Sequence, residues 1–195
     1  LTTSLASFNI EVTNTNDTPT DMVLDASAID ENSAIGTTVA TVTTTDVDAG
    51  DTTAYEQIGG SGADIFNISS PGGVITTEAA IDHETDASYT YQIRVTDSGS
   101  ATYTETFTIT ITDVNESPTD IALSSSSILE NQGSYSQIGI FSNTDSDNGE
   151  TYTYSLVSGA GDTNNSSFRI FKAGSTNILT ANNTTFNYET KDSYS

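Results

Sequence analysis

The chain has no cysteine, no tryptophan, three prolines and only four basic residues among its 195. Without cysteine it forms neither disulfides nor thiolate metal sites, so its stability depends on apolar cores or on ions held by oxygen atoms. No apolar run reaches about 20 residues, and the start at Leu1 has neither a basic nor an apolar leader-like region. We therefore expect no signal peptide in this stretch and no direct membrane insertion.

The shortage of basic residues leaves a large excess of negative charge. Twenty-seven acidic residues against four basic ones give a formal net charge of -23. Such a chain repels nucleic acid and anionic membrane surfaces, so we expect no nucleic-acid partner. Cations are the natural partners, and calcium is the one that an extracellular chain without disulfides would use.

An internal repeat organises the sequence. The segment SFNIEVTNTNDTPTDMVL at 7–24 reappears as TFTITITDVNESPTDIAL at 106–123, an offset of 99 residues. The segment IDHETDASYT at 81–90 likewise corresponds to FNYETKDSYS at 186–195, after a short insertion. The 99-residue offset also relates two pairs of acids, Glu31 with Glu130 and Asp46 with Asp145. A repeat of about 100 residues has the size of a seven-stranded β-sandwich.

The register divides the chain into three parts. We expect the last strand and linker of a preceding repeat at 1–18, a complete repeat at 19–117, and a second repeat at 118–195 that is truncated in its sixth strand. The chain is thus interpreted as a piece of a longer protein, with an incomplete last repeat.

Alternating apolar and polar residues predict strands rather than helices. The runs at 89–95 and 107–111 alternate strictly, as half-buried strands do. Shorter strands are expected at Asp21–Leu24, 39–43, 54–58, Phe66–Ile68 and 74–76. No window shows a convincing apolar period of 3.6 residues. We therefore predict an all-β fold of tandem seven-stranded Greek-key β-sandwiches.

The acids recur as short motifs at the expected strand ends. These motifs are Glu31-Asn32, Asp46-Val47-Asp48-Ala49-Gly50, Asp82-His83-Glu84, Asp97 within VTDSG, and Asp113-Val114-Asn115-Glu116 before Pro118. In this order and twice over, they resemble the calcium-binding motifs of cadherin repeats. The segment TDIALSSSSILEN looks more like the cadherin-like repeats of large bacterial surface proteins of the adhesin type than like vertebrate cadherins.

The resemblance implies a cadherin- or immunoglobulin-like sandwich with calcium ligands at the junctions between repeats. At the central junction it implies Glu31, Asp82, Glu84, Asp113, Asn115, Glu116, Asp145 and Asp147. At the N-terminal junction it implies Asn14, Asn16, Asp17, Asp46, Asp48 and Asp97. In the second repeat, Glu130 and Glu189 take the places of Glu31 and Glu84. Carboxylate and amide oxygens are the ligands that Ca²⁺ takes, six to eight at a time.

The sequence departs from the family pattern at a few positions. Asn14 and Asn187 stand where aspartate is usual, and His83 replaces the usual arginine. We therefore expect weaker or incomplete metal occupancy at the N-terminal junction. A lone histidine between two acids is chemically able to act as a general base, but no nucleophile, phosphate loop or zinc signature accompanies it. We expect no enzymatic activity.

The preferred hypothesis is mechanical: calcium rigidifies successive repeats of a secreted, extracellular, cell-surface protein, which serves as a structural or adhesive stalk in cell adhesion. The expected partners are calcium, neighbouring repeats of the same chain and other copies. A first alternative is a polysaccharide-binding accessory module of a secreted enzyme, using a Thr- and Tyr-rich face or an acidic loop. A second alternative is a filament subunit whose copies complete one another head to tail by strand donation.

Overall fold

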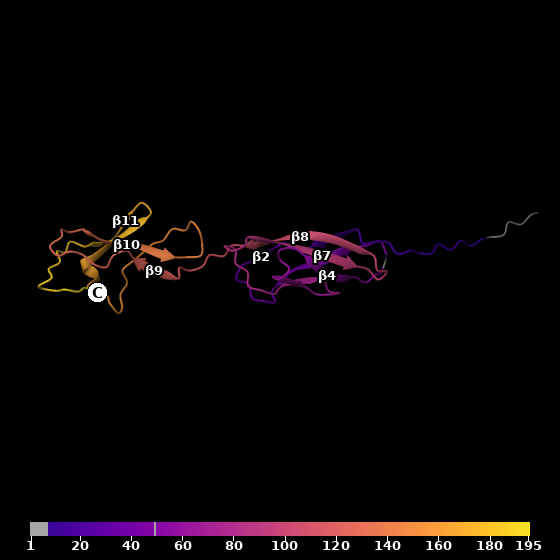
Figure 1. Ribbon diagram of the computed structural model, residues 1–195, viewed down its shortest axis with the longest axis horizontal. Coiled ribbons are helices and arrows are strands. Elements are labelled where there is room, and N and C mark those ends of the chain that lie inside the picture. Colours follow the sequence, from indigo (N-terminus) through magenta and orange to yellow (C-terminus); the bar gives the residue numbers. More distant parts are fainter. Residues whose placement is uncertain (1–7, 49) are drawn as a thin grey trace, which may run out of the picture. The chain divides into compact units, whose positions relative to one another are not determined.

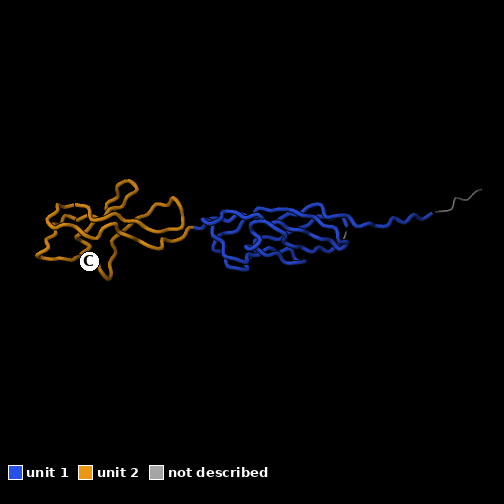
Figure 2. Tube along the Cα trace, viewed as in Figure 1, with its two compact units in different colours: residues 1–114 blue, residues 115–195 orange. Residues whose placement is uncertain are grey.

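The computed structural model describes residues 8–48 and 50–195. The chain divides into two compact units, Leu1–Val114 and Asn115–Ser195, here called unit 1 and unit 2 (Figures 1 and 2). Strands carry nearly all the regular structure of the described residues, and none of their helices is long and apolar enough to cross a membrane. The predicted all-β class is confirmed.

Unit 1 is a sandwich of two four-stranded sheets. In the first sheet the strand order is β1-β3-β6-β5, with β1 at Asp21–Leu24, β3 at Thr38–Thr45, β6 at Val74–Thr77 and β5 at Phe66–Ile68. In the second sheet the order is β2-β8-β7-β4, with β2 at Ala28–Asp30, β8 at Thr102–Thr112, β7 at Ser88–Thr96 and β4 at Ala54–Gly59 (Figure 1).

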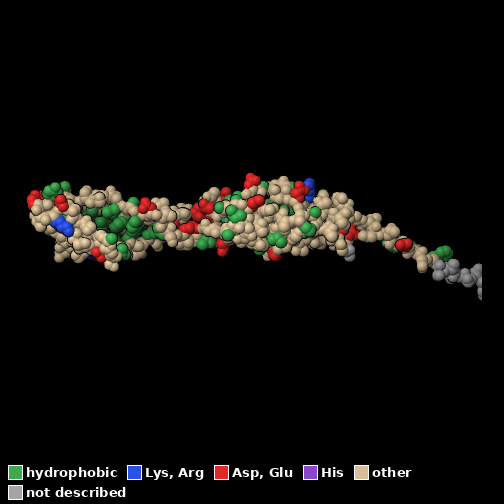
Figure 3. All heavy atoms as spheres, turned by 90° about the horizontal axis from the view of Figure 1, so that it is seen from below, with side chains coloured by type: hydrophobic (Ala, Val, Ile, Leu, Met, Phe, Trp, Pro, Cys, Tyr) green, Lys and Arg blue, Asp and Glu red, His purple; other side chains and the backbone are tan. Residues whose placement is uncertain are grey.

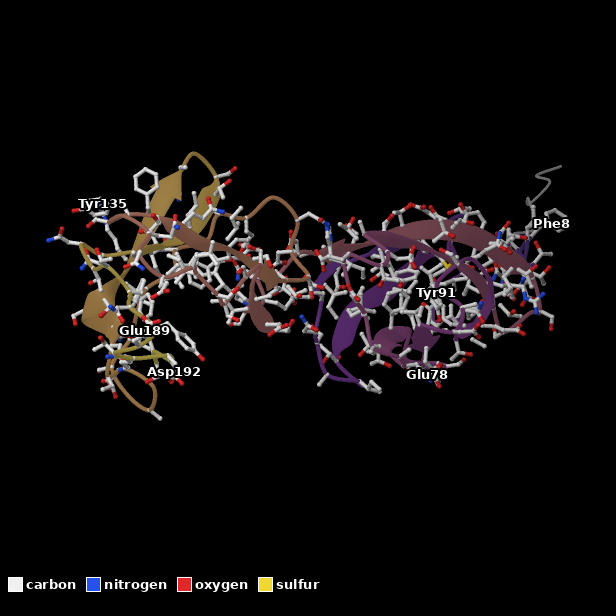
Figure 4. The ribbon with its side chains drawn as sticks, turned by 60° about the vertical axis from the view of Figure 1, so that its left-hand side comes forward. Phe8, Glu78, Tyr91, Tyr135, Glu189 and Asp192 are labelled. Carbon is white, nitrogen blue, oxygen red and sulfur yellow. The ribbon has the colours of Figure 1, made fainter. Side chains whose placement is uncertain are left out.

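The alternating runs explain how the two sheets form one core. In β7 and β8 every second side chain faces inward, and Tyr91 opposes Phe107 across the antiparallel pair. Tyr91 is fully buried and lies inside unit 1, whereas Glu78 lies at its surface (Figure 4). The fully buried residues of this core also include Ile75, Ile93, Val95, Ile109 and Ile111.

One strand of unit 1 was not predicted. The three residues of β2 pair in parallel with the end of β8, with Ile29 opposite Ile111. After β1 the chain therefore crosses from the first sheet to the second. The crossing places Glu31 directly after β2, where its backbone N–H donates to the Thr112 carbonyl at 3.0 Å.

Unit 2 contains one sheet, of the same order as the first sheet of unit 1. Its order is β9-β10-β12-β11, with β9 at Asp120–Leu123, β10 at Gln137–Thr144, β12 at Thr176–Ala181 and β11 at Phe168–Ala173, and a 3₁₀ turn at Asn165–Ser167 precedes β11. Residues 115–195 form no second sheet. A small core of Ile138, Ala181 and Phe186 packs on one face, and hydrophobic side chains gather at the surface of this unit (Figure 3).

The segment that precedes β1 has no strand in its described part. The predicted last strand of a preceding repeat begins in residues 1–7, which lie outside the described residues, and residues 8–20 form no strand. Phe8, Ile10 and Val12, which alternate as a strand would, are all exposed. Strand donation to another copy stays a prediction.

Candidate metal centres

The first acidic cluster of unit 1 forms where β3 and β7 end. Asp46 follows the last residue of β3, and Asp97 follows the last residue of β7. Asp51 comes from the turn after β3, and carboxylate oxygens of these three aspartates lie within 4.8 Å of one another. Asn14, Asn16, Asp17 and Asp48 join them through hydrogen bonds, and together these seven residues are called the N-terminal cluster of unit 1.

Hydrogen bonds fix the direction of its carboxylates. Asp48 accepts from the Asn14 side-chain amide and from the Asp17 backbone N–H, both at 2.7 Å, and these two bonds hold its pKa below the ordinary aspartate value. Asp97 is only 6% exposed and accepts from the Ala101 N–H at 2.8 Å and the Asn16 side-chain amide at 3.0 Å. These hydrogen bonds therefore orient both carboxylates before any ligand binds, and those to Asp48 favour its ionised form.

Two oxygens of this cluster are buried without a hydrogen-bond donor. They are Oδ2 of Asp46 and Oδ2 of Asp51. No N–H or O–H group of the described residues donates a hydrogen bond to either oxygen. A buried carboxylate oxygen without a donor is costly, and neighbouring carboxylates repel it further. A cation with oxygen ligands would satisfy both demands, so these residues fit a bound metal ion.

A second cluster lies at the opposite ends of the unit 1 strands, where Glu31 is its buried centre. Glu31 is 4% exposed. Its Oε2 accepts from the His83 N–H and its Oε1 from the Val114 N–H, each at 2.8 Å. These two bonds lower the pKa of Glu31, so the carboxylate stays charged although it is buried.

Two further acids join Glu31 in what is called the C-terminal cluster of unit 1, which also includes Asp113 next to Glu84. Carboxylate oxygens of Glu31, Asp82 and Glu84 lie within 4.8 Å of one another. Asp82 accepts from the Thr85 hydroxyl at 3.0 Å and from the Glu84 N–H at 3.0 Å, and the Thr85 bond is the main cause of its lowered pKa. The loop 82–85 thus folds around the Asp82 carboxylate, as Asp favours in turns.

His83 lies beside this cluster. One of its ring nitrogens and carboxylate oxygens of Glu84 and Asp113 lie within 4.8 Å of one another. Its ring Nδ1–H donates to the Ile111 carbonyl at 2.7 Å, which raises the pKa of the imidazole, and the negative charges of Asp113 and Glu84 raise it further. The ring is therefore anchored to the end of β8.

Unit 2 repeats the hydrogen bonds of the N-terminal cluster at its own start. In unit 1, Asp17 N–H donates to Asp48 Oδ2, and Asp48 N–H donates to Asp46 Oδ1 at 2.9 Å. In unit 2 the Glu116 N–H donates to Asp147 Oδ2 at 2.7 Å, and the Asp147 N–H donates to Asp145 Oδ1 at 3.2 Å. Asn115 donates to the Glu116 carbonyl as Asn16 does to that of Asp17.

The same kind of oxygen is left without a donor in unit 2. Oδ2 of Asp145 and Oδ1 of Asp147 are buried and accept no hydrogen bond from the described residues. Oxygens of Asp145, Asp147 and Glu150 lie within 4.8 Å of one another. The arrangement is thus built twice in one chain, which argues against a chance gathering of turn acids.

Asp51 and Glu150 were not among the predicted ligands. Each nevertheless contributes an oxygen to the acidic group of its own unit. A signal was present in the sequence, since 150 − 51 gives the same offset of 99 that relates the other motifs. An acid kept at one position in both repeats is a better guide than the family pattern, which does not require it.

The other end of unit 2 is less complete. Glu130 accepts from the Tyr188 N–H at 3.1 Å, as Glu31 does from His83, and Asn187 holds Thr190 as Asp82 holds Thr85. Glu130 and Glu189 are both exposed, and neither belongs to a group of three acids among the described residues. Asn187 in place of aspartate accounts for part of this difference, because it removes one carboxylate.

Comparison with known proteins relates this chain to one family. Residues 26–112 match the family model of the cadherin domain. The chain is 30% identical over 137 residues to protocadherin Fat 4 of mouse, covering 67% of this chain and 3% of that protein. It is 26% identical over 129 residues to human protocadherin gamma-A12, covering 63% of this chain and 14% of that one. The chain therefore spans only a small part of the curated relatives that it matches.

Solved structures agree in fold. Cadherin-23 EC22-24 of mouse superposes with a TM-score of 0.66 at 21% identity, covering 85% of this chain and 53% of that one. The human desmocollin-1 ectodomain superposes with a TM-score of 0.60 at 25% identity, covering 89% of this chain and 35% of that one. The matched family model and the protocadherin relatives belong to the cadherins, which are adhesion proteins and not enzymes, as the sequence predicted for this chain. The chain thus has the fold of tandem cadherin β-sandwiches, and residues 26–112 match the cadherin domain itself.

Proposed function

We propose that this chain is a calcium-binding segment of an extracellular, adhesion-type repeat protein. The observation that carries the proposal is the acidic arrangement built twice, with buried carboxylate oxygens that have no donor in either unit. Every candidate ligand supplies an oxygen, and no thiolate exists in the chain. Hard Ca²⁺ is the common extracellular ion that takes such ligands.

The proposed ligands are those of the three clusters. In the N-terminal cluster of unit 1 they are Asn14, Asn16, Asp17, Asp46, Asp48, Asp51 and Asp97. In the C-terminal cluster of unit 1 they are Glu31, Asp82, Glu84 and Asp113, and at the start of unit 2 they are Asn115, Glu116, Asp145, Asp147 and Glu150. Glu130 and Glu189 form a weaker candidate pair at the other end of unit 2.

The proposed role of calcium is to rigidify consecutive repeats. Without metal, the acids gathered at the end of a unit repel one another, and only hydrogen bonds restrain its loops and linker. Calcium would remove the repulsion and fix the short linker that precedes Pro118. A series of such repeats would form a stiff stalk, with each repeat stabilised by its own core and by its neighbours.

The proposed location is extracellular, on a cell surface. Extracellular calcium modules bind the ion with Kd values of about 10⁻⁴ to 10⁻³ M, which requires the millimolar calcium found outside cells. The absence of cysteine is compatible with this location if calcium takes the stabilising role of disulfides. An origin in a bacterial adhesin stays a prediction, based on the segment at 119–131 alone.

The function is tested by measuring shape and flexibility as calcium is added. Small-angle X-ray scattering of the whole chain should show a narrower distribution of maximum dimensions in 5 mM CaCl₂ than in EGTA. Mg²⁺ at the same concentration is the control, because it demands a smaller octahedral site and should not substitute. Identical scattering in calcium and in EGTA would refute the rigidifying role.

A further inference from the structure

The exposed face of the unit 2 sheet carries a small cavity that has no acidic residue in its lining. Tyr135, Arg169, Phe171 and Thr180 line it, and its volume is about 230 Å³. Arg169 and Phe171 alternate along β11 and so share a face, and Thr180 lies opposite Arg169 in the register of β11 and β12. This set of four residues is called the Arg169 site.

The positions in unit 1 that correspond to the Arg169 site have different side chains. Gly36 corresponds to Tyr135 at the offset of 99, and the backbone bond is the same in both. The Gly36 N–H donates to the Thr77 carbonyl at 2.8 Å, and the Tyr135 N–H to the Ala181 carbonyl at 3.0 Å. The turn is therefore conserved between the two units, while its side chain changes from none to a phenol.

The β5–β6 hairpin of unit 1 gives the other two positions. Phe66 opposes Thr77 as Phe168 opposes Ala181, so Arg169 corresponds to Asn67 and Phe171 to Ser69. Three replacements, one at Tyr135 and two in β11, each by a larger side chain, thus meet at one place in unit 2. Asn67, Ser69 and Gly36 are exposed in unit 1, where both sheets are present. The face therefore remains open to solvent in a two-sheet sandwich.

Tyr135 keeps its position at a conformational cost. Its φ is 68°, in the left-handed region, where Gly36 has a φ of 89°. A bulky side chain is rarely found there, and such strained residues cluster at binding sites. Tyr135 is 57% exposed and lies at the outside of unit 2, apart from Glu189 and Asp192 (Figure 4). No core packing therefore accounts for the strained tyrosine.

Arg169 is the charged centre of the site. Its guanidinium carbon lies 5.9 Å from the Tyr135 ring centre and 6.0 Å from that of Phe171. Within the described part of the chain its guanidinium forms no ion pair, although the chain has 27 acidic residues. By contrast, Arg94 of unit 1 pairs with Glu56. Arg169 thus presents its donors to solvent, held against two aromatic rings.

We propose that the Arg169 site binds a carboxylate-bearing sugar, such as a uronic acid unit of a polysaccharide. No acidic residue lines the site, and at physiological ionic strength charges are screened over about 8 Å, so the guanidinium and not the net negative charge of the chain governs a small anion here. The guanidinium fork would hold the carboxylate through paired hydrogen bonds, and the exposed faces of Tyr135 and Phe171 would pack against the C–H face of the sugar ring. The cavity is smaller than the roughly 300–1,000 Å³ of sites for drug-sized ligands, so it suits a single ring. An acidic peptide would use the arginine but not two aromatic platforms.

The binding test uses the whole chain and trigalacturonate as the probe, in 150 mM NaCl with EGTA. Calcium is removed because it bridges acidic sugars to acidic proteins without any arginine. The variants Arg169→Asn, Phe171→Ser and Tyr135→Gly each take the residue of unit 1, which the fold accepts. Lys172→Gln is the matched control, since it removes one positive charge from the neighbouring β11 position that faces the other way.

The site is supported if calorimetry shows trigalacturonate binding that Arg169→Asn weakens about tenfold or more, with Lys172→Gln unchanged. Phe171→Ser and Tyr135→Gly should also weaken it, and Tyr135→Gly should raise the melting temperature because the strain is relieved. Neutral maltotriose should not bind. The proposal is overturned if trigalacturonate does not bind, if Lys172→Gln weakens it as much as Arg169→Asn, or if pentaglutamate binds equally well. These outcomes are independent of calcium binding.

Discussion

The substitution Asp46→Asn distinguishes most sharply between two roles of Asp46, that of a metal ligand and that of a structural turn residue. Asp46 Oδ1 accepts the Asp48 N–H, a role that the asparagine carbonyl keeps. Its Oδ2, buried without a donor, is replaced by an amide that donates to the carboxylates of Asp51 and Asp97. The change therefore removes one charge and one proposed calcium ligand and leaves the turn intact.

Without calcium, this variant should be more stable than the wild type. Two unit charges 4.8 Å apart repel by about 0.9 kcal/mol at the dielectric constant of water. Asp46 forms two such pairs, so losing its charge should raise the free energy of unfolding by about 1.7 kcal/mol. A kcal/mol shifts the melting temperature of a domain of this size by roughly 4–8 °C.

With calcium, the stability advantage of the variant should shrink to a few tenths of a kcal/mol or reverse. A site with a Kd of about 10⁻⁴ to 10⁻³ M stabilises the folded state by about 2.7 to 1.4 kcal/mol at 10 mM calcium. A variant that no longer binds gains none of this. Adding 10 mM calcium should therefore stabilise the wild type by this amount and leave the unfolding free energy of the variant unchanged.

The assay is thermal unfolding of both proteins by calorimetry, in 1 mM EGTA and in 10 mM CaCl₂. Asp64→Asn is the matched control, because Asp64 is exposed in the glycine-rich loop and belongs to no acidic group of the described residues. It should behave as the wild type does in both buffers. If Asp46→Asn loses the same stability in both buffers, Asp46 is a structural turn residue and the reasoning is wrong.

Three further predictions concern unit 1. Glu31→Gln should destabilise unit 1 in calcium-free buffer at neutral pH. Because the fold lowers the pKa of Glu31, the stability difference between wild type and variant should narrow as the pH falls below the ordinary value of 4.5. Thermal melts at several pH values would show a constant difference if the hydrogen bonds from His83 and Val114 do not favour the charged form. Ile109→Ala should cost about 2–5 kcal/mol in urea titration, since Ile109 is fully buried between the sheets, and a cost near zero would contradict that placement. Gly60→Ala should also destabilise unit 1, because a Cβ there would overlap the Thr90 carbonyl oxygen and because the φ is 99°. An unchanged urea midpoint would contradict that close approach.

Periodicity and the internal repeat predicted the sheets of unit 1 well. The strict alternation at 89–95 and 107–111 marks β7 and β8, whose inward side chains form the centre of the core. The strands β1 and β5 have the predicted bounds. The 99-residue offset also brought the equivalent acids of the two repeats into register, and the structure shows equivalent hydrogen bonds around Asp48 and Asp147.

Other features depended on tertiary contacts that the sequence pattern does not carry. The three residues of β2 are too few for a period, and only their parallel pairing with β8 makes them a strand. The glycine-rich stretch at 59–67 turns against the backbone of β7, where the Gly62 N–H donates to the Thr90 carbonyl. The Arg169 site joins residues of three separate segments, which no local motif connects.

The most direct test of the account is a calorimetric titration of the whole chain with calcium, beside the same titration of Asp46→Asn and Glu84→Gln. The account predicts binding with a Kd of about 10⁻⁴ to 10⁻³ M, a melting temperature that rises with calcium, and fewer ions bound by each variant. If 10 mM calcium neither binds nor raises the melting temperature of the wild type, the acidic clusters are solvated turns and the calcium-rigidified stalk is contradicted.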